Sequence, residues 1–139
     1  MIYGLGSCVG VALYDPAVRS GGLAHVMLPS SRLSSKVHLP GKFADTAVPA
    51  LVEGLLRQGA VRERLVAKLV GGANMFSFLP QATVSIGVRN AAAVREKLTE
   101  MGIPILAERT GGDQGRTILF DLKDGRLEIR RLNRSSEWI

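Results

Sequence analysis

The chain has 139 residues, of which 46% are hydrophobic and 22% are charged, and this composition excludes a disordered or low-complexity protein. The length falls in the commonest range for one domain, so we expect residues 1–139 to form a single domain. The net charge is +6, but the basic residues are scattered and aromatic residues make up only 5%, which disfavours nucleic-acid binding. An acidic protein partner is a simpler use of the excess positive charge.

Apolar runs in the sequence are much shorter than the roughly 20 residues needed to cross a bilayer, and no signal pattern is visible. A single cysteine forms no intramolecular disulfide, and a reactive thiol is best kept in a reducing compartment. We therefore expect a cytoplasmic protein without membrane insertion. The cysteine and the two histidines lack the spacing of a tetrahedral zinc site, so we expect no metal and no cofactor.

Two strands are predicted near the start of the chain. Residues 9–14 are apolar and predict a buried strand, which the turn pair Asp15-Pro16 closes. Residues 23–27 predict a second strand that opens after Gly21-Gly22 and has His25 at its middle. A hairpin-like connection would place the two strands side by side.

The only cysteine, Cys8, stands in the run Gly4-Leu5-Gly6-Ser7-Cys8-Val9-Gly10, directly before the first strand. A thiol attacks a carbonyl carbon as the thiolate, so it needs a neighbouring imidazole such as His25 to lower its pKa. Backbone N–H groups around Gly6 and Ser7 would converge on an oxyanion. These features favour a cysteine enzyme, whereas the spacing alone is typical of a small hydrophobic cysteine in a core strand.

The next segments are a loop and a helix. Residues 29–41 form a long loop rich in Ser, Pro and Lys, and His38 within it has no obvious partner. Apolar residues over 44–58 lie on one helical stripe, and Gly59 ends the helix. Pro49 removes a backbone donor, so we expect the regular helix to begin within a turn of it or to bend there.

A strand over residues 65–70 leads into the segment Gly71-Gly72-Ala73-Asn74-Met75-Phe76. This segment lacks the Lys-Ser/Thr end of a phosphate-binding loop, so it gives little support for nucleotide binding. Two interpretations stay open. The glycines mark a strand end that needs positive φ, or Asn74 and Phe76 lie on the rim of a substrate cleft.

The last segments predict a helix, a strand and a hairpin. The helix is expected over residues 91–101, with Asn90 as its N-cap, and the strand over 103–107. Strands over 117–122 and 126–132 flank Asp124-Gly125, which predicts a tight turn of primed type. We interpret the densest basic cluster as the solvent-facing side of the last strand and a frayed tail; its members are Arg126, Arg130, Arg131 and Arg134.

Strands and helices thus alternate before an antiparallel end. This order predicts an α/β fold in which helices pack on a layered, mixed β-sheet.

Several of these segments closely resemble the CheD family of chemoreceptor glutamine deamidases. The resemblance begins with the cysteine run and with residues 23–29, which contain His25. Further matching segments follow in the same order: Pro40-Gly41-Lys42-Phe43-Ala44-Asp45-Thr46-Ala47, Gly71-Gly72-Ala73-Asn74-Met75-Phe76, Ile86-Gly87-Val88-Arg89-Asn90 and Ala107-Glu108-Arg109-Thr110-Gly111-Gly112. Together they span almost the whole chain. The resemblance implies the layered α/β cysteine-hydrolase fold shared with deamidating bacterial toxins.

The resemblance also implies residue roles, with Cys8 as the nucleophile and His25 as its general base and acid. The family carries a threonine six residues before the cysteine, and this position is occupied here by Ile2, which has no hydroxyl. The hydroxyl of Ser7, the hydroxyl of Thr110, a backbone carbonyl or a water molecule would serve to orient His25 instead, and the sequence does not distinguish among them. The family normally has a further stretch with a strand ahead of this point, so we expect a start assigned too far downstream or a truncated gene.

The activity implied by the resemblance is hydrolytic deamidation of specific glutamine side chains to glutamate on methyl-accepting chemotaxis receptors. A CheC-type phosphatase of the chemotaxis pathway is implied as a second partner. Because Ile2 replaces the orienting residue, an alternative is a weakly catalytic or non-catalytic docking module that binds the receptors or the phosphatase.

Overall fold

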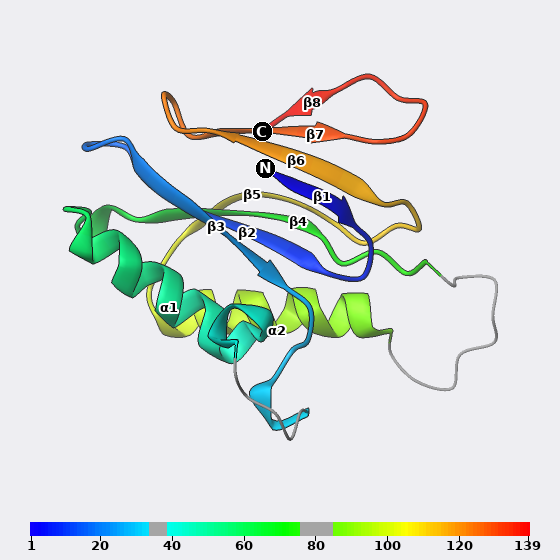
Figure 1. Cartoon of the computed structure of the whole chain (residues 1–139), viewed down its shortest axis with the longest axis horizontal. Coiled ribbons are helices and arrows are strands. Elements are labelled where there is room, and N and C mark those ends of the chain that lie inside the picture. The colour runs from blue at the N-terminus through cyan, green and yellow to red at the C-terminus, as the bar shows by residue number, and fades with distance from the viewer. Residues whose placement is uncertain (34–38, 76–84) are drawn as a thin grey trace.

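The computed structural model describes residues 1–33, 39–75 and 85–139, which form two β-sheets and a layer of helices (Figure 1). The strands are β1 (Ile2–Leu5), β2 (Val9–Asp15), β3 (Ser20–Val26), β4 (Val66–Gly71), β5 (Ile105–Thr110), β6 (Arg116–Asp121), β7 (Arg126–Arg130) and β8 (Glu137–Trp138). The helices are α1 (Ala44–Arg57) and α2 (Ile86–Glu100), with short 3₁₀ helices at Ser31–Leu33, Pro40–Lys42 and Arg62–Arg64.

The middle layer is a mixed sheet with the strand order β3-β2-β4-β5. β2 pairs antiparallel with β3 and with β4, whereas β4 and β5 are parallel. All of β2 is buried because the helices cover one face of this sheet and the second sheet covers the other. The predicted strand pair at the start of the chain and the mixed sheet with packed helices are therefore confirmed.

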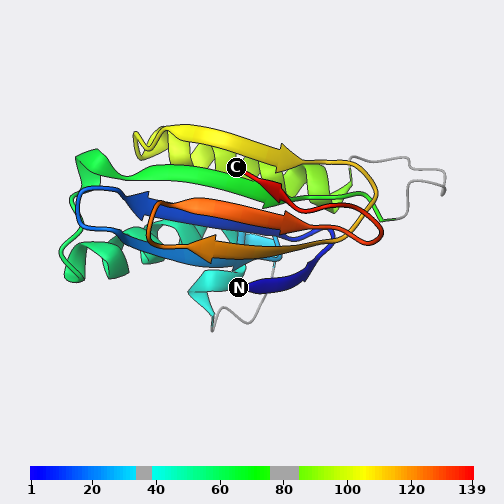
Figure 2. The same ribbon diagram turned by 90° about the horizontal axis from the view of Figure 1, so that it is seen from above.

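The C-terminal hairpin does not extend this sheet, so the expectation of a single sheet is wrong. β6, β7 and β8 join β1 in a second four-stranded sheet, in the order β1-β6-β7-β8. The inward side chains Ile118, Leu127 and Ile129 are fully buried and pack on Ala12 and Val70 of the middle sheet. The hairpin thus lies over the face of the middle sheet opposite the helices (Figure 2), and its alternating apolar side chains pack on that face.

Helix α2 begins earlier than the sequence suggests, and the prediction of Asn90 as its N-cap is wrong. Ser85 is the N-cap, and its hydroxyl accepts a hydrogen bond from the N–H of Val88 at 3.4 Å. Gly87 lies in the first turn, where a Cβ would stand 2.4 Å from the carbonyl oxygen of Ala73. Glycine is a poor helix former, but here it allows α2 to approach this backbone closely.

The hairpin turn and the C-terminal tail also differ from the predictions. Asp121 pairs with Arg126, so four residues separate the strands rather than the two of a primed turn. Of these four residues, only Gly125 has positive φ, at 76°. The tail is not frayed, because β8 pairs with β7 and completes the second sheet.

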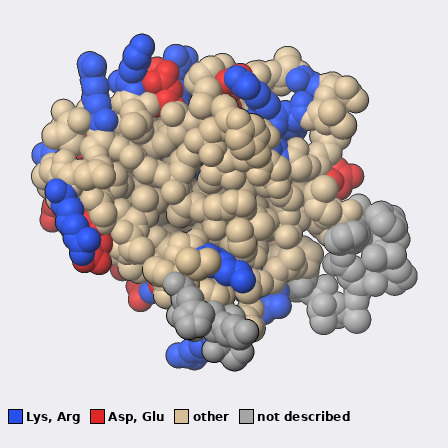
Figure 3. All heavy atoms as spheres, in the orientation of Figure 1, with Lys and Arg blue, Asp and Glu red and all other residues tan. Residues whose placement is uncertain are grey.

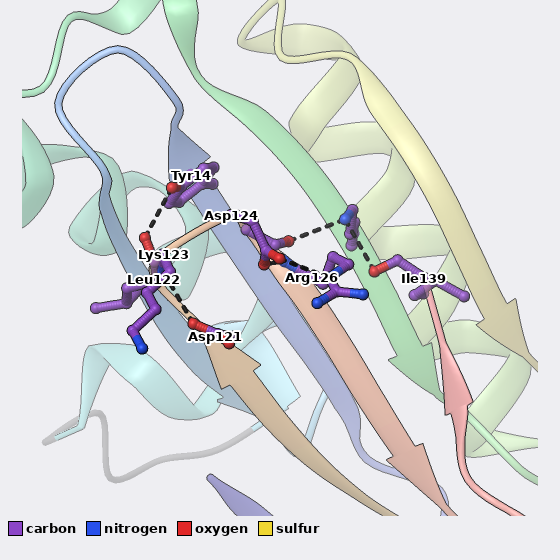
Figure 4. A network of polar contacts seen from close by, with 9 residues as sticks. Tyr14, Asp121, Leu122, Lys123, Asp124, Arg126 and Ile139 are labelled. Atoms are coloured by element: carbon purple, nitrogen blue, oxygen red, sulfur yellow. Dashed lines mark hydrogen bonds and ion pairs between the residues drawn. The ribbon is translucent and has the colours of Figure 1, made fainter.

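A network of polar contacts joins the two sheets at the turn between β6 and β7 (Figure 4). The hydroxyl of Tyr14 donates to the carbonyl of Leu122 at 2.7 Å. Lys68 on β4 donates through Nζ to the carbonyls of Gly125 and Ile139, at 2.9 and 3.0 Å. Burial lowers the pKa of Lys68, and the carbonyls take the place of its water shell.

The described residues show neither a membrane-spanning helix nor a metal cluster. No helix among them is both long and apolar enough to cross a bilayer, and no group of three potential metal ligands is found in this part of the chain. Figure 3 shows lysine and arginine side chains spread around the outline of the molecule, with acidic side chains among them.

Asp15 at the end of β2 is a buried carboxylate with four hydrogen-bond contacts. It accepts from the N–H groups of Val61 at 2.8 Å and Ala17 at 3.0 Å, and both of its oxygens accept from Nε of Arg64, at 3.0 and 3.1 Å. The hydrogen bond from Arg64 is the main cause that lowers the pKa of Asp15 to about 2.

We expect Asp15 to make folding stability depend on pH in the acidic range. Its pKa is lower in the folded chain than the value of about 3.9 in an unfolded chain, so its contribution is complete above about pH 4 and is lost as the pH falls toward about 2. Urea unfolding followed by circular dichroism across this range measures the loss. Asp15→Asn should remove this part of the pH dependence and Asp113→Asn, at an exposed site, should keep it; identical profiles for the two variants would contradict the assignment.

Candidate active site

Cys8 lies in the short loop between β1 and β2 and is half-buried. The carbonyl of Gly6 accepts a hydrogen bond from the N–H of Ala73 at 2.9 Å, and the carbonyl of Cys8 accepts one from the N–H of Gly72 at 2.8 Å. The loop is thus fixed through its carbonyl groups to the segment that follows β4. Neither of these bonds uses an N–H group of the loop.

The segment that follows β4 needs its glycines. Gly71 and Gly72 have φ values of 118° and 65°, which side chains rarely adopt, and a Cβ on Gly71 would stand 2.3 Å from the carbonyl oxygen of Cys8. The predicted strand end with positive φ is therefore confirmed. The N–H of Asn74 donates to the carbonyl of Gly112 at 2.8 Å, and its place on a substrate rim stays a prediction. Phe76 lies outside the described residues.

His25 is positioned by the register of the β2–β3 pair, in which it stands directly opposite Gly10. Opposed residues of an antiparallel pair point to the same face. On Gly10 that face is toward the second sheet, because a Cβ there would stand 2.7 Å from Cδ1 of Ile118. The side chain of His25 therefore points between the two sheets.

Cys8 packs on the same layer between the sheets, against the apolar cluster that contains Ile118. Cys8 stands two residues before Gly10 and one residue outside the ladder, which ends at Val9 and Val26. If the ladder continued, this position would be diagonal to His25, and diagonal positions in an antiparallel pair lie about 7 to 8 Å apart, which a histidine side chain can span. The predicted proximity of the two strands is confirmed by this register.

The imidazole of His25 is not engaged as the sequence suggests. Its Nε2 atom is buried and has no hydrogen-bond partner, and the described residues contain no hydrogen bond between His25 and Cys8. Burial raises the pKa of the Cys8 thiol, so the thiol form is favoured in this state. A buried nitrogen without a partner costs free energy, and catalytic hydrogen bonds often tighten only when substrate is bound.

Ile2 on β1 lies beside this pair. Its Cδ1 atom stands 3.6 Å from the place where a Cβ on Gly10 would be, and its side chain packs on the same cluster as Cys8. Position 2 is thus next to the cross-strand partner of His25, although isoleucine offers no hydrogen bond. The hydroxyl of Thr110, which the sequence offered as a partner of His25, accepts a hydrogen bond from Arg95 and donates one to Glu108.

Sequence reasoning missed one polar residue of the site. Asn90 on α2 is fully buried, and its Nδ2 atom donates to the carbonyl of Ser7 and to the carbonyl of Met27, both at 3.0 Å. An asparagine in the interior of a helix is the signal that would have identified it, because asparagine is a weak helix former. The expected N-cap role concealed this signal.

Comparison with known proteins identifies the family of the chain. The family model described as CheD chemotactic sensory transduction matches residues 27–131. A probable chemoreceptor glutamine deamidase CheD of Clostridium novyi (strain NT) is 52% identical over 128 residues, which cover 91% of this chain and 79% of the relative. Its counterpart in Desulforamulus reducens is 52% identical over 130 residues, which cover 93% of this chain and 78% of the relative. The chain belongs to the CheD family.

Proposed function

We propose that this protein hydrolyses the side-chain amide of specific glutamines on methyl-accepting chemotaxis receptors, which yields glutamate and ammonia. The family and the names of the relatives in Clostridium novyi and Desulforamulus reducens support this activity. The observation that carries the proposal for this chain is the β2–β3 register, because it brings His25 to the face on which Cys8 lies.

The mechanism begins with transfer of the Cys8 proton to His25. The thiolate then attacks the carboxamide carbon of the receptor glutamine and forms a tetrahedral intermediate. His25 returns the proton to the departing ammonia, which leaves a thioester on Cys8. A water molecule activated by His25 hydrolyses the thioester, and the product glutamate carries a negative charge that the glutamine lacked.

The loop around Gly6 and Ser7 would stabilise the oxyanion of the tetrahedral intermediate. The carbonyls of Gly6 and Cys8 are held by Ala73 and Gly72, so the peptide groups of the loop are fixed before substrate binds. Fixed N–H donors are effective because they need no reorganisation during the reaction, and loss of one such donor typically costs about 10²-fold or more in rate.

The wider assignments follow from the family. We propose that residues 1–139 act as one domain of the deamidating-toxin type of cysteine hydrolase, located in the cytoplasm and independent of any cofactor. Asn74 would lie on the rim of the substrate cleft. The partners would be the receptors, as substrate, and a CheC-type phosphatase, without nucleic acid or membrane insertion. The net charge of +6 is suited to acidic protein partners.

Incubation of the purified chain with a cytoplasmic receptor fragment tests the proposal. Ammonia release and the glutamine-to-glutamate mass change, assigned to individual peptides by mass spectrometry, should appear together. The same fragment with its modified glutamines replaced by alanine serves as the control. Binding of the fragment without any conversion would instead support the docking module.

The docking module is the second candidate because Ile2 cannot hydrogen-bond to His25 through its side chain. Loss of an orienting residue generally lowers activity without abolishing it, since the nucleophile and the oxyanion donors remain. We therefore expect an enzyme whose histidine is incompletely oriented rather than an inactive protein.

Ile2→Thr should raise kcat by about three- to tenfold, because one net hydrogen bond to His25 contributes about 0.5–1.5 kcal/mol. Ile2→Val is the matched control, since valine has the shape of threonine without the hydroxyl. Both variants remove the Cδ1 atom that packs near Gly10, so they share the packing loss. Steady-state deamidation rates of the two variants test whether a hydroxyl at position 2 orients His25, and equal rates would show that it does not.

A further inference from the structure

Asn90 connects three parts of the molecule. It stands on α2, yet its amide reaches the loop that precedes β2 and the end of β3. The carbonyl of Ser7, which it holds at 3.0 Å, belongs to the peptide bond that joins Ser7 to Cys8. The carbonyl of Met27, also at 3.0 Å, lies two residues beyond His25.

An asparagine buried inside a helix, as Asn90 is, is unfavourable for folding stability. Asparagine is a weaker helix former than alanine or leucine, and Asn90 lies inside α2 with no exposed surface. Its Oδ1 atom is buried without a hydrogen-bond partner in the described part of the chain. An apolar residue at this position would avoid both costs, so neither helix formation nor packing explains the amide.

The chemistry of the two contacts does explain it. Both partners are carbonyl oxygens, which need donors, and a primary amide supplies two N–H groups from a single nitrogen. An aspartate of the same shape would present oxygens to oxygens, and an amide rotated by 180° would do the same. The contacts therefore fix the orientation of Asn90 as well as the separation of the carbonyls of Ser7 and Met27.

We propose that Asn90 is a positioning residue for the deamidation reaction, which holds the Cys8 loop and the end of β3 at the spacing that lets Cys8 and His25 exchange a proton. The inference rests on the proposed function. The register aligns β2 with β3 only from Val9 and Val26 onward, so Cys8 stands beyond the last paired residue. The amide of Asn90 bridges the two chains where the ladder has ended.

The loop is also fixed from its other side by the segment after β4. The N–H of Gly72 holds the carbonyl of Cys8 at 2.8 Å, and the first turn of α2 packs on Gly72 through Gly87. α2 therefore supports the nucleophile both directly, through Asn90, and through this backbone. Loss of the amide should let the loop move relative to His25 while the helix remains in place.

The test compares Asn90→Ala and Asn90→Leu with Leu98→Ala. Leu98→Ala leaves a cavity under the C-terminal half of α2 and destabilises the fold, but it touches neither the carbonyls of Ser7 and Met27 nor the first turn that packs on Gly72. We expect the Asn90 variants to lower kcat by about 10²-fold with little change in KM, because small displacements of reacting groups cost about this much. Leu98→Ala should lower the melting temperature and leave kcat unchanged.

A second measurement needs no receptor and separates this inference from the proposed function. The rate of Cys8 alkylation by iodoacetamide across pH reports how readily the thiolate forms. Asn90→Ala should slow alkylation at neutral pH as much as His25→Gln does, whereas Leu98→Ala should match the unmodified chain. If the unmodified chain deamidates no receptor, this comparison still decides the role of Asn90.

Two results would overturn the inference. One is an unchanged kcat in a folded Asn90 variant. The other is an alkylation profile of Asn90→Ala that coincides with that of the unmodified chain. If Asn90→Ala does not fold, Asn90→Leu, which fills the buried site without adding a charge, supplies both results.

Discussion

Cys8→Ala is expected to lower the rate of receptor deamidation by on the order of 10⁴-fold or more. Alanine cannot form the thioester, and the remaining loop can only stabilise an oxyanion made by direct attack of water. The fold should persist, because Cys8 is a half-buried residue at the edge of the cluster between the sheets and makes no side-chain hydrogen bond within the described residues. Site-resolved mass spectrometry of the receptor peptides measures the loss.

Two controls make this result specific. Binding of the receptor fragment to Cys8→Ala should stay near that of the unmodified chain, because the thiol is a small part of any contact surface. Cys8→Ser keeps a nucleophilic atom of lower reactivity and should also lose nearly all activity. Deamidation by Cys8→Ala at more than a tenth of the original rate would place the nucleophile elsewhere.

His25→Gln is expected to lower kcat by about 10²- to 10⁴-fold, the range typical of a lost general base and acid. The effect is also expected on the free enzyme. Burial already raises the pKa of the Cys8 thiol, and His25→Gln removes the imidazole that we assign as its proton acceptor, so alkylation at neutral pH should slow.

His38→Gln is the matched control, since His38 is the other histidine of the chain and no catalytic role is assigned to it; it lies outside the residues that the structure describes. It should leave both kcat and the alkylation profile unchanged. If His25→Gln retained the original rate, or if the two histidine variants behaved alike, the general base would have to be another group.

Elements with a strong local signal were predictable from the sequence. The continuous apolar run of β2, the turn at Asp15 and the helical stripe of α1 gave bounds within a few residues of those observed. The pairing of β2 with β3 followed from their short connection. That pair places His25 on the face of the sheet against which Cys8 packs, whereas the roles of the two residues were predicted from the family resemblance and not from local patterns.

The remaining features depend on contacts between distant parts of the chain. In the second sheet, β1 pairs with β6, although the two strands are more than a hundred residues apart in the sequence. No local pattern reveals such a partner. The start of α2 was missed because Gly87 weakens the helical pattern, and the reason for the glycine is the backbone of Ala73. The N-cap role predicted for Asn90 was wrong for a similar reason, because its hydrogen-bond partners, the carbonyls of Ser7 and Met27, are far away in the sequence.

The central claim is that a thioester on Cys8 lies on the route from glutamine to glutamate. Hydroxylamine tests it most directly, because this nucleophile competes with water for an acyl-enzyme and converts it to a hydroxamate. We predict that the chain, given receptor fragment and hydroxylamine, forms glutamyl hydroxamate at the modified positions, and that Cys8→Ala forms none. Glutamate formation at an undiminished rate without any hydroxamate would contradict a covalent intermediate, and with it the assigned role of Cys8.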